Sequence, residues 1–99
     1  MTILHLTLKK KWFDMILSGE KDEEYREIKP YWESRLQWGY GTNYPRFKEF
    51  DSISFKNGYS KDSPSFSVEC LGIQIGNGKE EWGAEPNKKY FIIHLGGKR

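Results

Sequence analysis

The chain has 99 residues, a length that suggests one domain with one modest core. Its 16 Lys and Arg residues and 14 Asp and Glu residues leave a net charge of +2, too small to indicate a nucleic-acid-binding protein by itself. One cysteine excludes an internal disulfide and, with two histidines, a thiolate zinc site. We find neither a signal-peptide pattern nor an apolar run of about 20 residues, and we expect a cytoplasmic protein without a metal or cofactor.

The first two predicted elements are a strand and a helix. Residues 3–8 alternate apolar and polar side chains, which predicts a strand with its three leucines on one face. Over residues 9–18 the apolar spacing becomes helical, and Gly19 is a natural stop for that helix. Lys9 and Lys10 lie at the predicted helix start, where the helix dipole disfavours cations. They are therefore either placed to bind an anion or part of a solvated run of charge.

The next segment, residues 21–28, is a strand candidate in which nearly every side chain is charged. If it is extended, Glu24 and Arg26 share one face and Glu23 and Tyr25 share the other. Neither face is apolar, so the strand is either a solvated edge or the floor of a polar cleft. Strict alternation would separate Lys21 from Glu24, and a shared cleft therefore requires a turn or bulge near residue 22.

The rest of the chain predicts mostly strands. A short helix is expected over residues 31–37, followed over 38–50 by an aromatic-rich loop that is either a lid or stacking platform, or a loop held on the core by its rings. Strands are expected over 51–55, 66–75 and 90–95, with Ile53 and Phe55 inward. In the longest strand, alternation puts Val68 and Ile73 on opposite faces, while Gly72 suggests either a bulge or a close approach of another backbone.

These elements predict a mostly β, α+β fold: a small PUA-like β-barrel of about five strands, with one or two short helices covering one end. The sequence contains no phosphate-binding loop, dinucleotide fingerprint, zinc-protease motif or nucleophile elbow. Any chemistry must therefore come from Lys, Glu, Arg, Tyr and Asp side chains.

Residues 16–26 read Ile-Leu-Ser-Gly-Glu-Lys-Asp-Glu-Glu-Tyr-Arg. The motif Gly-x-Lys-x-x-Glu-x-Arg after a helix, together with the upstream Leu6-Thr7-Leu8 strand and Trp12-Phe13, resembles the ASCH domain family of PUA-like barrels. The close match covers residues 4–36. The resemblance implies a cleft beside the first helix, lined by the charged residues of the motif.

The resemblance also implies two kinds of activity. ASCH domains were proposed to bind RNA, some members have been described as ribonucleases, and one branch consists of small amidohydrolases that act on N4-acetylcytidine through a Lys, a Thr and a Glu. Lys21 matches the catalytic lysine, but Glu24 stands where that branch has its threonine nucleophile. A carboxylate cannot replace a hydroxyl in forming an ordinary ester acyl-enzyme, so this departure weakens the amidohydrolase assignment.

Three hypotheses follow for the charged segment. It binds RNA or a nucleotide-like molecule, it catalyses hydrolysis of a modified nucleoside or of RNA with Lys21 and Glu24 as the catalytic pair, or it is an ion-pair network that protects an edge strand. We favour binding. The candidate ligand-binding residues are Lys9, Lys10, Lys21, Glu24, Tyr25, Arg26, Trp38 and Tyr40.

Overall fold

A computed structural model describes residues 2–38 and 46–99. The elements in chain order are β1 (Ile3–Thr7), α1 (Lys10–Leu17), β2 (Glu23–Glu27), α2 (Pro30–Leu36), β3 (Gln37–Trp38), β4 (Arg46–Phe47), β5 (Ser52–Lys56), β6 (Ser65–Asn77), the 3-10 turn η1 (Glu80–Trp82) and β7 (Lys89–Lys98). The predicted α+β, mostly β fold is confirmed. Within the described ranges, no helix has the length and apolar character needed to cross a bilayer.

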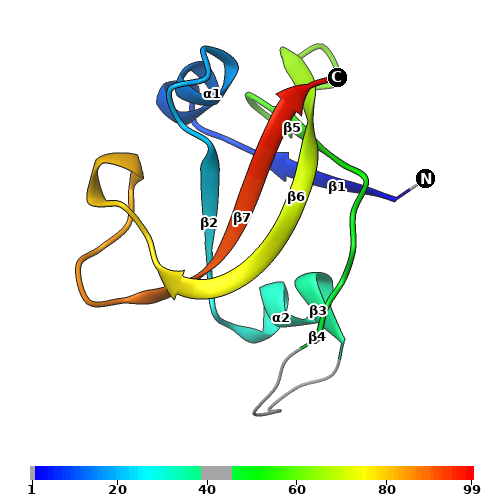
Figure 1. Cartoon of the computed structure of the whole chain (residues 1–99). Helices are drawn as coiled ribbons and strands as arrows, with labels where there is room; N and C mark the ends of the chain where they lie inside the picture. The colour runs from blue at the N-terminus through cyan, green and yellow to red at the C-terminus, as the bar shows by residue number, and fades with distance from the viewer. Residues whose placement is uncertain (1, 39–45) are drawn as a thin grey trace.

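Five strands form one curled sheet in the order β1-β5-β6-β7-β2, and Figure 1 shows the long strands β6 and β7 bending across it. The β1–β5 pair is parallel and the other three pairs are antiparallel. The curl makes a half-barrel whose two edge strands, β1 and β2, do not pair with each other. The seam between these two edges is the feature that organises the candidate site.

The core fills the concave side of the half-barrel. The predicted inward residues Ile53 and Phe55 are fully buried, and alternate residues of β1 and β7 pack with them. Helix α1 contributes Phe13 and Ile16, whereas α2 contributes Leu36. Figure 1 shows the two helices at opposite ends of the sheet. Each helix therefore closes one end of the core and brings its polar flank to the rim of the half-barrel.

The bulge expected at Gly72 is present, and it corrects one sequence prediction. Cys70 pairs with Leu95 and Ile73 pairs with Ile93, so two residues of β6 oppose one residue of β7 between these pairs. Gly72 has φ +138°, a conformation that residues with a Cβ rarely adopt. The extra residue reverses the alternation, so Ile73 packs on the same core as Val68 instead of on the opposite face.

The predicted loop over residues 38–50 is also corrected at its two ends. Gln37 and Trp38 pair with Phe47 and Arg46 as a two-stranded antiparallel sheet, β3–β4. Phe47 packs edge-on against Phe91 of the main core, with ring centres 6.2 Å apart. The aromatic content of this segment thus partly serves to hold it on the core. Residues 39–45 lie outside the described part of the chain.

Candidate functional site

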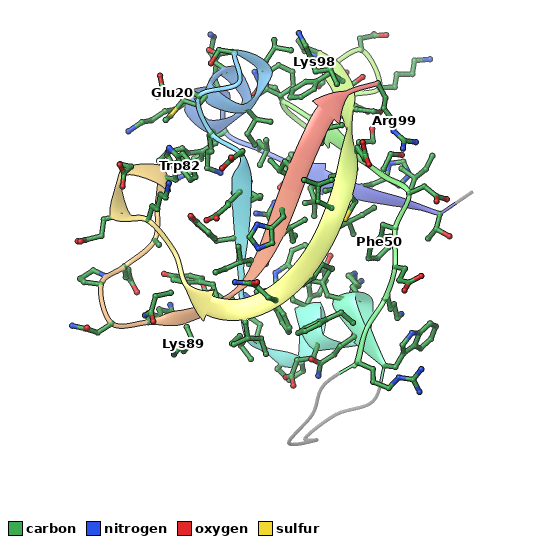
Figure 2. All side chains as sticks on the ribbon, viewed as in Figure 1. Glu20, Phe50, Trp82, Lys89, Lys98 and Arg99 are labelled. Atoms are coloured by element: carbon green, nitrogen blue, oxygen red, sulfur yellow. The ribbon has the colours of Figure 1, made fainter. Side chains whose placement is uncertain are left out.

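A cleft of about 620 Å³ lies along the seam between β1 and β2. Residues 5–7 of β1 line one side and residues 24–27 of β2 line the other; α1, α2 and the segment 82–90 supply the remaining walls. Figure 2 shows Trp82 on the loop between β6 and β7, to the left of β2. The aromatic residues that line the cleft are Trp12, Tyr25, Tyr31, Trp32, Tyr59, Trp82 and Tyr90. The cations that line it are Lys9, Arg26, Lys29 and Lys88.

A buried ion-pair network lies at the β2 side of the cleft. Lys21 Nζ is 2.6 Å from Glu24 Oε1, and Arg26 Nη1 is 3.3 Å from Glu24 Oε2. The side chains of these three residues are 0%, 6% and 16% exposed, respectively. One carboxylate therefore contacts two cations in a region with little water, where such contacts are strong and the loss of one partner is costly.

Lys21 reaches Glu24 because it precedes the strand instead of belonging to it. Helix α1 ends at Leu17, and the Lys21 N–H donates to the Met15 carbonyl oxygen at 3.0 Å across the turn. Strand β2 begins only at Glu23. The turn that a shared Lys21–Glu24 site requires is therefore present. Because Lys21 lies in this turn, the alternation of side chains between the two faces of β2 does not determine where its side chain points.

Lys21 is covered by the residues that line the cleft. Its Nζ lies 5.3 Å from the centre of the Trp12 ring and 5.7 Å from the centre of the Tyr25 ring. Burial lowers the pKa of Lys21, and the neighbouring Glu24 carboxylate partly opposes this effect. Lys21 is not among the cleft-lining residues. Its ammonium group can fix the position and charge of Glu24 but does not face a molecule in the cleft.

Arg26 is the cation of the network that lines the cleft, next to Glu24. Its Nη1 donates to the Tyr25 carbonyl oxygen at 2.8 Å, and its Nη2 donates to the Thr7 carbonyl oxygen at 3.3 Å. The guanidinium carbon lies 5.2 Å from the centre of the Trp32 ring. A guanidinium group has five N–H donors, so Arg26 keeps donors that these bonds do not use. Arg26 lines the cleft, and a guanidinium group with free donors can contact an anion there.

Tyr25 supports the segment between β6 and β7, which forms one wall of the cleft. Its hydroxyl donates to Glu23 Oε1 at 2.7 Å and accepts the Lys79 N–H at 3.0 Å, and burial raises its pKa. The backbone between β6 and β7 also lies very close to two aromatic rings. A Cβ added to Gly78 would lie 2.8 Å from the Tyr25 ring, and one added to Gly83 would lie 3.0 Å from the Trp12 ring. The wall that carries Trp82 is thus packed directly on α1 and β2.

The structure does not bring all predicted site residues to the cleft. Lys9 lines it, but Lys10 is exposed elsewhere and forms an ion pair with Asp14 at 2.6 Å. Trp38 is 61% exposed on β3, where Lys48 Nζ lies 4.7 Å from its ring centre, and it is not among the lining residues. Tyr40 falls outside the described residues.

Sequence reasoning missed the three tryptophans that do line the cleft. Trp12 lies on the apolar stripe of the first predicted helix, and Trp32 lies in the short predicted helix over residues 31–37. Trp82 lies in a polar segment with no periodicity. All three are half-buried. An indole that packs one edge on the core and leaves the other open has the same spacing as a fully buried one, so only the position of the neighbouring elements distinguishes the two cases.

No protein-family model, curated protein or solved structure matches this chain. The ASCH family therefore remains a resemblance carried by residues 4–36. Among residues 2–38 and 46–99, no group of three or more His, Cys, Asp or Glu side chains is arranged to hold a metal ion.

Proposed function

We propose that the cleft binds RNA or a nucleotide-like molecule, with a base between aromatic rings and a phosphate near the cations. The observation that carries this proposal is the convergence of three of the four tryptophans with Arg26 on one cleft. Aromatic faces accept any nucleobase, and a guanidinium group matches a phosphate with two parallel hydrogen bonds. The volume of about 620 Å³ is in the usual range for small-molecule sites.

The charge balance of the cleft favours moderate, salt-sensitive binding. Glu24, Glu27 and Glu85 line the same cleft as its four cations, so its electrostatic attraction for an anion is limited. Lys88 is engaged by Glu85 at 3.3 Å and Glu27 at 3.7 Å. Among these cations, Arg26, Lys9 and Lys29 are therefore the expected phosphate contacts.

The test is a titration of isotope-labelled protein with a nucleoside panel that includes N4-acetylcytidine, with nucleoside 5′-monophosphates and with short single-stranded RNA, followed by two-dimensional NMR. At about 50 mM salt, we expect shifts at the cleft-lining residues and affinity that falls as salt rises. No shift with any of these molecules, while the spectrum shows a folded protein, would exclude the proposal.

Lys9 and Lys10 provide a matched pair of variants for the phosphate contact. Both are exposed and adjacent in sequence, but only Lys9 lines the cleft. We expect Lys9→Ala to weaken RNA binding and to reduce its salt dependence by about one phosphate contact. Lys10→Ala should leave both quantities unchanged.

Hydrolysis of a modified nucleoside or of RNA is the second candidate, and the 2.6 Å Lys21–Glu24 contact is the observation that favours it. Burial and a charged neighbour are common means of tuning the pKa of a lysine or glutamate for acid–base catalysis. Catalysis would require exposure of Lys21, because its side chain is covered. Product signals that grow with time in the same NMR samples, and that disappear in Lys21→Met, would place hydrolysis ahead of binding.

A further inference from the structure

The two edge strands of the half-barrel differ in how their outward backbone groups are satisfied. Just before β2, the Asp22 carbonyl oxygen accepts the Leu95 N–H at 3.0 Å, so even-numbered residues here direct their backbone groups toward β7. The odd-numbered residues of β2 therefore direct their N–H and carbonyl groups away from β7. Tyr25 is one of these residues. Its N–H donates to Glu24 Oε1 at 3.0 Å and its carbonyl oxygen accepts Arg26 Nη1 at 2.8 Å. At Tyr25, the β2 edge is thus closed by the strand's own side chains.

The β1 edge is not closed in this way. Ser52 N–H donates to the Thr2 carbonyl oxygen and Leu8 N–H donates to the Lys56 carbonyl oxygen, so even-numbered residues of this strand face β5. His5 and Thr7 therefore direct their backbone groups away from the sheet. The Thr7 carbonyl oxygen accepts Arg26 Nη2, which confirms this direction.

Three outward groups of β1 remain open next to the cleft. Within residues 2–38 and 46–99, the His5 N–H, the His5 carbonyl oxygen and the Thr7 N–H have no hydrogen-bond partner. Strand β1 has the sequence Ile-Leu-His-Leu-Thr, without the charge, proline or bulge that usually protects an edge. Unpaired backbone groups of this kind are strong hydrogen-bonding groups that require a partner.

We propose that the His5 carbonyl oxygen and the Thr7 N–H read the Watson–Crick edge of a nucleobase bound in the cleft. The carbonyl of one residue and the N–H two residues later point the same way along a strand edge, as an acceptor beside a donor. A base with a donor next to an acceptor on its Watson–Crick edge complements this pair: the amino group and ring nitrogen of adenine or cytosine, or the imino N–H and carbonyl of uracil.

The surroundings of the edge favour a planar small molecule over an added strand. His5 and Thr7 line the cleft together with Trp12, Trp32 and Trp82, which enclose it from three other elements. Arg26 crosses the seam to Thr7 and occupies the carbonyl that a continuing strand would need. A flat heterocycle can reach the His5 carbonyl oxygen and the Thr7 N–H in this space, with a ring face against an indole. This inference rests on the proposed nucleotide-binding function.

The experiment uses two matched pairs of probes, each as the 5′-monophosphate: uridine and 3-methyluridine, and adenosine and N6,N6-dimethyladenosine. The bases are neutral in both members of a pair, so the two members carry the same charge. Each methylated probe keeps its ring and phosphate but loses the donor that His5 would accept. We expect the methylated member to bind roughly tenfold more weakly. We also expect the Thr7 amide proton to shift downfield only with the unmethylated member.

The outcomes separate this inference from the function on which it rests. Equal affinity within each pair, with cleft shifts but an unmoved Thr7 amide, would overturn base reading by β1 and leave nucleotide binding intact. No cleft shift with any probe would remove both proposals. Protection of the His5 and Thr7 amides that grows with protein concentration in the absence of nucleotide would assign the edge to a second copy of the chain, and would also overturn the inference.

Discussion

Arg26 Nη2 donates a hydrogen bond to the Thr7 carbonyl oxygen at 3.3 Å, and this contact spans two edge strands that have no ladder between them. The same guanidinium group contacts Glu24 and the Tyr25 carbonyl oxygen. One side chain therefore closes the seam of the half-barrel and presents its remaining donors to the cleft. Arg26 therefore couples the stability of the seam to the ligand binding that we propose.

We expect Arg26→Ala to lower the free energy of unfolding by roughly 3 kcal/mol, because it leaves a buried carboxylate with one cation fewer and removes the donor from two carbonyl oxygens. Urea denaturation measures this value. Arg35→Ala is the control: Arg35 is exposed on α2 and donates to one carbonyl oxygen, and its loss should cost about 1 kcal/mol or less. Equal costs for the two variants would show that Arg26 belongs to a surface ion-pair network.

Lys21 should impose a measurable pH dependence on stability. Its pKa in the folded protein is below the ordinary value of 10.5, because burial disfavours the charged form. Between the two values the unfolded chain binds more protons than the folded one, so the free energy of unfolding rises with pH. Comparison of the protein with Lys21→Met by urea denaturation between about pH 8 and pH 10 isolates this effect. A difference between the two that does not change with pH would contradict it.

Gly83→Ala should disturb the wall that carries Trp82. Gly83 has φ +101°, and an added Cβ would lie 3.0 Å from the Trp12 ring. We expect a cost of about 1–2 kcal/mol from the left-handed conformation alone, and weaker nucleotide binding because Trp12 and Trp82 are displaced. Gly97→Ala is the control, since Gly97 does not have a positive φ and nothing lies within 4 Å of the added Cβ. Thermal unfolding and the NMR titration provide the two measurements.

Tyr25→Phe should loosen the same wall without changing the ring packing. The variant removes the acceptor of the Lys79 N–H and the donor to Glu23. We expect a cost of about 1–2 kcal/mol and faster hydrogen exchange at the Lys79 amide. Tyr59→Phe, at a residue that is 92% exposed, should change neither quantity. Unchanged exchange at Lys79 in Tyr25→Phe would show that the wall does not depend on the hydroxyl.

Much of the fold could be predicted from the sequence because its pattern is local. Alternation placed Ile53 and Phe55 in the core, and Gly72 indicated the place where the long strand has its bulge. The sequence could not show that the bulge would bring Ile73 to the side of Val68, because that depends on the pairing register with β7. A single extra residue reverses every face that follows it.

The candidate site, like the fold, could be predicted from the sequence only in part. Its charged motif was evident because Lys21, Glu24 and Arg26 lie within six residues, and the need for a turn before the strand followed from simple alternation. The tertiary structure alone decided that Arg26 would meet Thr7, that Lys9 would line the cleft while Lys10 would not, and that Lys21 would be covered. Side-chain type and spacing are properties of the chain, but which groups face one another across a seam depends on how the sheet curls and which strands are left at its edges.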